Sequence, residues 1–143
     1  MSDKPDFMLQ IFIRTDLDSL WEALLDPEHV AAYNFACNKA VTRPDGGYDV
    51  LREDESTMLS MRLISSEPKS KLEFSFEPNW GEEEGKNSRL VLLLEAEGSS
   101  CKLTVEHYQI PESQGGVREG WSRQFSSLKS YLETGSALKA PGV

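Results

Sequence analysis

The strongest constraint on the fold is an apolar stripe near the C-terminus. Between residues 117 and 135, large apolar residues follow one another at intervals of four, four, three and four positions: Val117, Trp121, Phe125, Leu128 and Leu132. This spacing puts all five on one side of a helix, with serines and charged residues on the other side. A helix of about 20 residues is about 30 Å long, and its apolar side must be covered by another element of comparable size.

Residues 38–111 are the part of the chain that can cover this helix, because they have the pattern of successive strands. Residues 71–78 alternate strictly between apolar and polar side chains, which is typical of a strand with one buried side. Residues 56–68, 88–98 and 101–111 also have strand-like sequences, and turn residues separate them. We therefore predict about six antiparallel strands that curl into a sheet, with the C-terminal helix on the concave face.

The N-terminal residues complete this order of elements. Residues 7–14 alternate as a half-buried strand. Two short helices follow, separated by Pro27, which cannot continue a helix because it lacks an amide hydrogen. Ser19 and Glu22 have the form of a capping box at the start of the first helix, and the second helix is expected at about residues 28–35.

The chain of 143 residues has the length of one domain. Gly135 is suited to end the last helix in a left-handed conformation. We therefore predict a single domain at residues 1–135, followed by a loose C-terminal tail at residues 136–143.

Charge and cysteine content narrow the possible partners and the compartment. Acidic residues outnumber basic ones by 24 to 15, which gives a net charge of −9, and so acidic a surface repels nucleic acid and anionic membranes. The longest aliphatic run, residues 90–94, is too short to insert into a membrane, and the N-terminus has no apolar signal region. Cys37 and Cys101 are too few for a disulfide framework. We expect a cytoplasmic protein with free thiols.

With these elements in this order, the sequence resembles the helix-grip proteins of the START-like superfamily, the SRPBCC group. Within it, the sequence is most similar to the family named after the activator of the heat-shock protein 90 ATPase. The matching segments span nearly the whole chain: LWEALLDPEHVAAY, GGYDV, EPKSKLEFSF, KLTVEHYQI and GWSRQFSSLKSYLETG. The resemblance implies an α+β helix-grip fold, like that of the birch pollen allergen. Such a fold has a curved antiparallel sheet of six or seven strands, two short helices after the first strand, and a long C-terminal helix.

The resemblance also implies an internal hydrophobic cavity between the sheet and the long helix, which relatives use to hold lipids, sterols or polyketides. Side chains that point inward by periodicity are candidates for its wall, and Tyr33, Phe35 and Trp80 are expected around its mouth. The alternative is ordinary packing in a filled core, or, for Trp80, an isolated aromatic residue on the surface. The candidate ligand-binding residues are Tyr33, Tyr48, Met61, Phe74, Phe76, His107, Trp121 and Phe125.

One residue has the chemistry for catalysis. His107 shares the inward side of its strand with Leu103 and Val105, and an imidazole in an apolar cavity can act as a general acid or base near neutral pH. The alternative is a core histidine that is hydrogen-bonded to a backbone group of a helix or loop. The sequence lacks the common motifs of serine hydrolases, phosphate-binding loops and zinc peptidases. Its two histidines and two distant cysteines form no usual metal set, so neither a metal nor another cofactor is expected.

Three functions remain open. The first is a carrier or sensor that binds a small hydrophobic molecule in the cavity, which the inward aromatic residues favour. The second is a cyclase, dehydratase or hydrolase that uses His107. The third is a stress-related module that binds a chaperone, which predicts an exposed apolar patch around Tyr33, Phe35 and Trp80. We expect the first function and regard catalysis as a weaker alternative.

Overall fold

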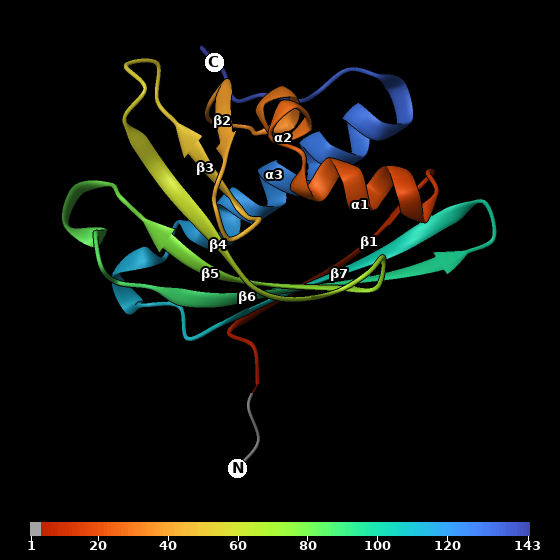
Figure 1. Cartoon of the computed structure of the whole chain (residues 1–143), viewed down its shortest axis with the longest axis horizontal. Coiled ribbons are helices and arrows are strands. Elements are labelled where there is room, and N and C mark those ends of the chain that lie inside the picture. The colour runs from red at the N-terminus through yellow and green to blue at the C-terminus, as the bar shows by residue number, and fades with distance from the viewer. Residues whose placement is uncertain (1–3) are drawn as a thin grey trace.

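The computed structural model describes residues 4–143, and a curved sheet wraps around the C-terminal helix (Figure 1). The sheet has seven antiparallel strands in the order β1-β7-β6-β5-β4-β3-β2. Three α-helices lie on its concave side, so the predicted α+β helix-grip fold is confirmed. The strands are β1 (Phe7–Ile13), β2 (Lys39–Thr42), β3 (Tyr48–Leu51), β4 (Thr57–Glu67), β5 (Lys71–Pro78), β6 (Ser88–Glu97) and β7 (Ser100–Tyr108). The helices are α1 (Leu17–Leu25), α2 (Pro27–Tyr33) and α3 (Val117–Thr134), with short 3-10 turns η1 (Gly81–Glu83) and η2 (Glu112–Gln114).

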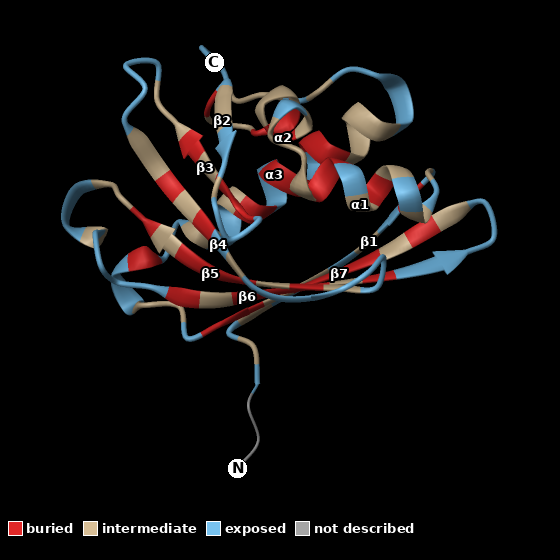
Figure 2. Ribbon diagram, in the orientation of Figure 1, coloured by how far each residue is buried: buried red, intermediate tan, exposed pale blue. Residues whose placement is uncertain are grey.

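The alternation along the strands decides which side chains form the core. In β5, Leu72, Phe74 and Phe76 are all buried beneath the helices. The strand register continues this row across the sheet, because Phe74 lies opposite Leu90 of β6, and Leu90 lies opposite His107 of β7. Figure 2 shows the resulting buried segments along β5, β6 and β7. The predicted inward side of β5 is therefore confirmed.

The first helix begins before Ser19, so the predicted capping box is wrong. Asp16 is the N-cap residue instead, and its Oδ1 accepts a hydrogen bond from the backbone N–H of Ser19 at 2.8 Å. A carboxylate at this position also interacts favourably with the positive end of the helix dipole. Asp26 then ends α1 and caps α2, whose first residue is Pro27. Proline suits that position because the first N–H of a helix has no intrahelical partner.

The apolar stripe of α3 lies against the sheet as predicted. Trp121, Phe125 and Leu128 are buried, and the residues at the two ends of the stripe are half-buried. Gly135 ends the helix with a φ of 84°, and its N–H donates to the carbonyl oxygen of Tyr131 at 2.9 Å. This left-handed conformation is one that glycine adopts without strain.

The C-terminal residues 136–143 are not loose, which corrects the prediction. Lys139 holds them against the end of α2 through its ammonium group, whose Nζ donates to the carbonyl oxygens of Ala31 at 2.8 Å and of Cys37 at 2.9 Å. The same Nζ donates to Oδ1 of Asn38 at 2.7 Å, and the backbone N–H of the next residue donates to the turn after α2. The last carbonyls of a helix lack intrahelical partners, so a cation binds well there.

Both cysteines are free thiols, as the sequence predicts. Sγ of Cys101 donates to the carbonyl oxygen of Thr15 at 3.3 Å, and Sγ of Cys37 lies 3.5 Å from Sδ of Met58. Burial raises the pKa of both thiols, which makes them poor nucleophiles. Among residues 4–143, no helix has the length and apolar character needed to cross a membrane.

Candidate functional site

A pocket of about 320 Å³ lies between the sheet and the N-terminal half of α3. Strands β3, β4 and β5 form one side of it, and the turn after α2, the loop after β5 and η2 border it. The volume is at the lower end of the range for small-molecule pockets. The described residues that line it include no charged side chain: Asn34, Phe35, Ala36, Tyr48, Val50, Met58, Leu59, Met61, Phe76, Trp80, Ser113, Gln114, Gly116, Val117, Gly120, Trp121 and Gln124.

The pocket brings together four of the eight candidate ligand-binding residues. The other four lie behind its wall, in the core of the domain. The four on the wall are Tyr48, Met61, Phe76 and Trp121. The four in the core are Tyr33, Phe74, His107 and Phe125.

The expected mouth of the cavity forms only in part. Phe35 and Trp80 line the pocket as expected. Tyr33 does not, because its ring is buried and its hydroxyl donates to the carbonyl oxygen of Ala23 in α1 at 2.8 Å. A buried tyrosine needs such a partner for its hydroxyl, and this bond turns the side chain toward α1.

His107 is fully buried and links β6 to α3 through both ring nitrogens. Nε1–H of Trp121 donates to Nδ1 of His107 at 2.8 Å, and Oγ of Ser88 lies 2.7 Å from Nε2. Because an indole nitrogen can only donate, Nδ1 must accept, and the ring proton is on Nε2, which donates to Ser88. Burial lowers the pKa of His107 to about 4, so the imidazole is neutral at pH 7.

This tautomer argues against the alternative in which His107 acts as a general base. A base needs a free lone pair, and the lone pair of Nδ1 already accepts from Trp121. Ser88 accepts a hydrogen bond from the imidazole, which is the opposite of what activates a serine nucleophile. The hydrogen bonds instead fix the ring of Trp121 on the pocket wall. The ring of Phe76 packs edge-on against both, with centroids 4.9 Å from His107 and 5.5 Å from Trp121.

Two buried amides on the pocket wall have a fixed orientation. Oε1 of Gln124 accepts from the backbone N–H of Phe35 at 3.1 Å. Oδ1 of Asn34 accepts from the backbone N–H groups of Ala36 at 3.0 Å and Cys37 at 2.9 Å. Since a backbone N–H can only donate, each amide must point its oxygen toward these N–H groups and its NH2 group away from them. Within residues 4–143, neither NH2 group has a hydrogen-bond partner.

Two further buried polar side chains line the pocket. The hydroxyl of Tyr48 has no hydrogen-bond partner among the described residues, and burial raises its pKa, so it keeps its proton at neutral pH. Gln114 uses its Nε2 to donate to the carbonyl oxygen of Lys86 at 3.0 Å, which leaves its Oε1 buried without a partner. A mainly apolar wall with a few polar groups is typical of small-molecule sites.

Gln124 is a pocket residue that the apolar stripe alone does not predict, although its position in the sequence carries a signal. Gln124 follows Val117 by seven positions and Trp121 by three, and it precedes Leu128 by four. These intervals put it on the same helical side as the stripe. A stripe defined by apolar residues leaves out a polar residue that is buried among them. Asn34 has no comparable signal, because its burial depends on the turn that follows α2.

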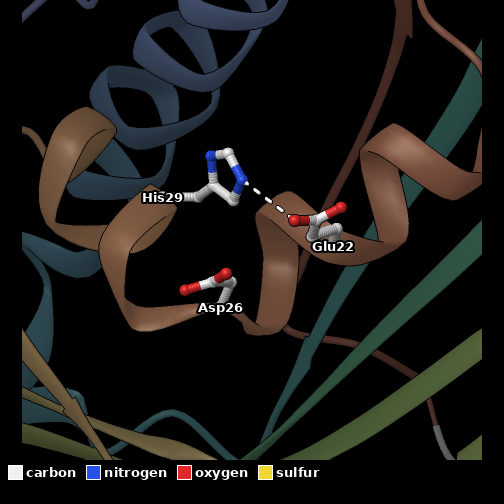
Figure 3. A group of neighbouring side chains, drawn as sticks. All are labelled: Glu22, Asp26 and His29. Carbon is white, nitrogen blue, oxygen red and sulfur yellow. Dashed lines mark ion pairs between the residues drawn. The ribbon is translucent and has the colours of Figure 1, made fainter.

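A second group of side chains lies at the junction of α1 and α2 (Figure 3), and none of its members lines the pocket. In the described part of the chain, Glu22, Asp26 and His29 are the group whose ligand atoms could hold a metal ion, within 4.8 Å of one another. Each already has a protein partner. Nε2 of His29 pairs with Glu22 at 3.4 Å and Nδ1 lies 2.6 Å from the hydroxyl of Tyr131, while Asp26 caps α2. These contacts account for the cluster as part of the helix packing.

Residues 14–133 match the family model described as activator of Hsp90 ATPase homolog 1-like protein. A search among curated proteins gave no significant match.

Several solved structures share the fold. The Aha1 dimer from Colwellia psychrerythraea is 16% identical, with a TM-score of 0.70 over 94% of this chain and 98% of that one. CalU16 from Micromonospora echinospora is 19% identical, with a TM-score of 0.67 over 87% of this chain and 72% of that one. DynU16, a protein of the dynemicin biosynthetic locus, is 20% identical, with a TM-score of 0.69 over 95% of this chain and 51% of that one. At these identities the likeness shows the fold alone.

Proposed function

Because the chain belongs to the activator of Hsp90 ATPase homolog 1-like family, we propose that it binds a small hydrophobic molecule as a carrier or sensor in the cytoplasm. The observation that carries the proposal is the mainly apolar pocket under α3, in which Met61, Phe76 and Trp121 stand beside a few buried polar groups. The likeness in fold to a protein of the dynemicin biosynthetic locus agrees with a small-molecule role. The free thiols agree with a reducing compartment.

The test is a nitrogen-15 NMR titration that follows the three indole N–H signals. The added compounds are a fatty acid, a sterol, a flavonoid and an aromatic polyketide. Trp80 and Trp121 line the pocket, whereas Trp21 lies outside its wall and serves as an internal control. We expect one class of compound to shift the signals of Trp80 and Trp121 in a saturable way and to leave Trp21 unchanged. If no compound shifts either pocket signal, or if all three signals shift together, the proposal fails.

A blocked variant sharpens this test. Gly120 lies on the pocket wall. A Cβ atom added at this position would lie 3.6 Å from Cζ of Phe35. We expect Gly120→Leu to fill the pocket and abolish the titration. Ser122→Leu is the matched control, because it adds the same side chain on the exposed side of α3 and should leave binding intact.

The two alternative functions have no specific observation in their favour. The chaperone-binding patch expected around Tyr33, Phe35 and Trp80 does not form, because Tyr33 is buried and the other two line the pocket. Catalysis through His107 conflicts with its hydrogen bonds, which occupy both ring nitrogens.

A further inference from the structure

The polar part of the pocket wall offers hydrogen-bond donors. Asn34 and Gln124 are 5% and 6% exposed, and their NH2 groups are the unpaired ends of two oriented amides. Neither amide can turn over, because the backbone N–H groups of residues 35–37 would then lose their acceptors. The hydroxyl of Tyr48, on a residue 7% exposed, is a third donor without a partner among the described residues. Gln114 adds none, since its NH2 group is used on Lys86.

The wall has no charge that would neutralise an ionised ligand. All of the described lining residues are apolar or uncharged polar. Burying a carboxylate or an ammonium without a partner of opposite charge is strongly unfavourable. At the border of the pocket, Lys86 lies 3.5 Å from the hydroxyl of Ser113, but its ammonium group is paired with the carboxylate of Glu83 at 3.7 Å and is therefore already neutralised. The pocket therefore suits an uncharged molecule.

We propose, as a refinement that rests on the proposed function, that the pocket selects uncharged and mainly apolar molecules with a carbonyl oxygen. That oxygen accepts hydrogen bonds from the NH2 groups of Asn34 and Gln124. A carbonyl oxygen has two lone pairs and can accept from both donors. Both amides are anchored to the same turn, residues 35–37, which keeps the two donors in one region of the wall. Ketones, quinones and lactones meet this description, and free fatty acids do not.

Three probes of the same shape test this selectivity. Methyl naphthyl ketone has the carbonyl acceptor, isopropylnaphthalene replaces it with a hydrocarbon group, and naphthoate replaces it with a carboxylate. Dissociation constants are measured at pH 7 from the fluorescence of the pocket tryptophans and from NMR. We expect the ketone to bind about 10- to 100-fold more tightly than the hydrocarbon, which corresponds to two net hydrogen bonds. We expect naphthoate to bind at least about tenfold more weakly than the ketone.

A substitution then identifies the donor. Gln124→Met keeps the length of the side chain and removes its NH2 group. We expect the advantage of the ketone over the hydrocarbon to fall by about 3- to 10-fold, because Asn34 still donates, while the affinity for the hydrocarbon stays the same. Met61→Leu is the control, because it changes the apolar wall and leaves every donor in place. The ratio between ketone and hydrocarbon should survive in this control.

The outcomes separate the refinement from the function on which it rests. Equal binding of ketone and hydrocarbon, or tightest binding of naphthoate, overturns the refinement and leaves the proposed function standing. An unchanged ratio in Gln124→Met overturns the assignment of the donor. If none of the three probes binds, the refinement fails, and the titration of the pocket tryptophans with the four compound classes decides separately whether the proposed function stands. If Gln124→Met does not fold, the three probes still decide the matter with the unmodified protein.

Discussion

The buried imidazole of His107 makes the stability of the protein depend on pH in a specific direction. Its pKa is about 4 in the folded chain, against an ordinary value of 6.5. Burial is the main cause; the nearby Arg118 lowers the pKa further, and Asp6 raises it. Because the folded state holds the neutral ring, the stabilisation is fully present above pH 6.5. It is lost as the pH falls from 6.5 toward 4, where only the unfolded chain binds the proton.

The size of the effect follows from the two pKa values. A difference of one in pKa corresponds to about 1.4 kcal/mol, so the whole loss is about 3 kcal/mol. About 2 kcal/mol of it falls between pH 7 and pH 5. Urea unfolding at both pH values measures the loss for the natural sequence and for His107→Gln, which retains a donor and an acceptor but does not titrate. The carboxyl groups are the same in both proteins, so their contribution cancels in the comparison.

We expect the natural sequence to lose about 2 kcal/mol more than His107→Gln between pH 7 and pH 5. The indole signal of Trp121 should also move near pH 4, because protonation of Nδ1 removes its acceptor. Equal losses in the two proteins would refute the reasoning. A change of the His107 ring signals near pH 6.5 would refute it as well, since the ring would then titrate as if exposed.

Three further predictions concern stability and are measured by urea unfolding. Gly47→Ala should cost at least about 1–3 kcal/mol, because its Cβ would lie 2.0 Å from the carbonyl oxygen of Met61; a neutral result would contradict this close approach. Phe74→Ala should cost about 3–5 kcal/mol, since the ring is fully buried, whereas truncating the half-exposed Phe12 should cost much less. Lys139→Met should cost about 1–3 kcal/mol and speed hydrogen exchange in residues 35–38; unchanged exchange would show that the tail does not hold that turn.

The periodicity of the sequence predicted those parts of the fold that depend on which side of an element is buried. The stripe of α3 and the alternation of β5 are of this kind, and both are confirmed. The predicted start of α1 was wrong because Asp16 and Ser19 can each cap a helix, and only the folded backbone decides between them. The docking of Lys139 could not be predicted, because its three acceptors lie in α2 and in the turn after it, about 100 positions away.

The site was harder to predict than the fold, for a physical reason. Inward periodicity names every side chain that leaves the solvent, but it does not separate a pocket wall from a filled core. Phe74 and Phe76 have the same pattern along β5, yet only Phe76 lines the pocket. The buried amide of Gln124 depends on the backbone of Phe35, 89 positions away, and no local pattern reports such a partner.

The pairing of the first strand with the last has a consequence for how the chain folds. Phe7 of β1 lies opposite His107 of β7, so the two strands cannot meet until about 100 further residues have been synthesised. Pairings between distant segments make folding slow, because the loop between them must be ordered first. Until β7 emerges from the ribosome, β1 has an apolar side with no neighbouring strand. The nascent chain is therefore most prone to aggregation late in its synthesis.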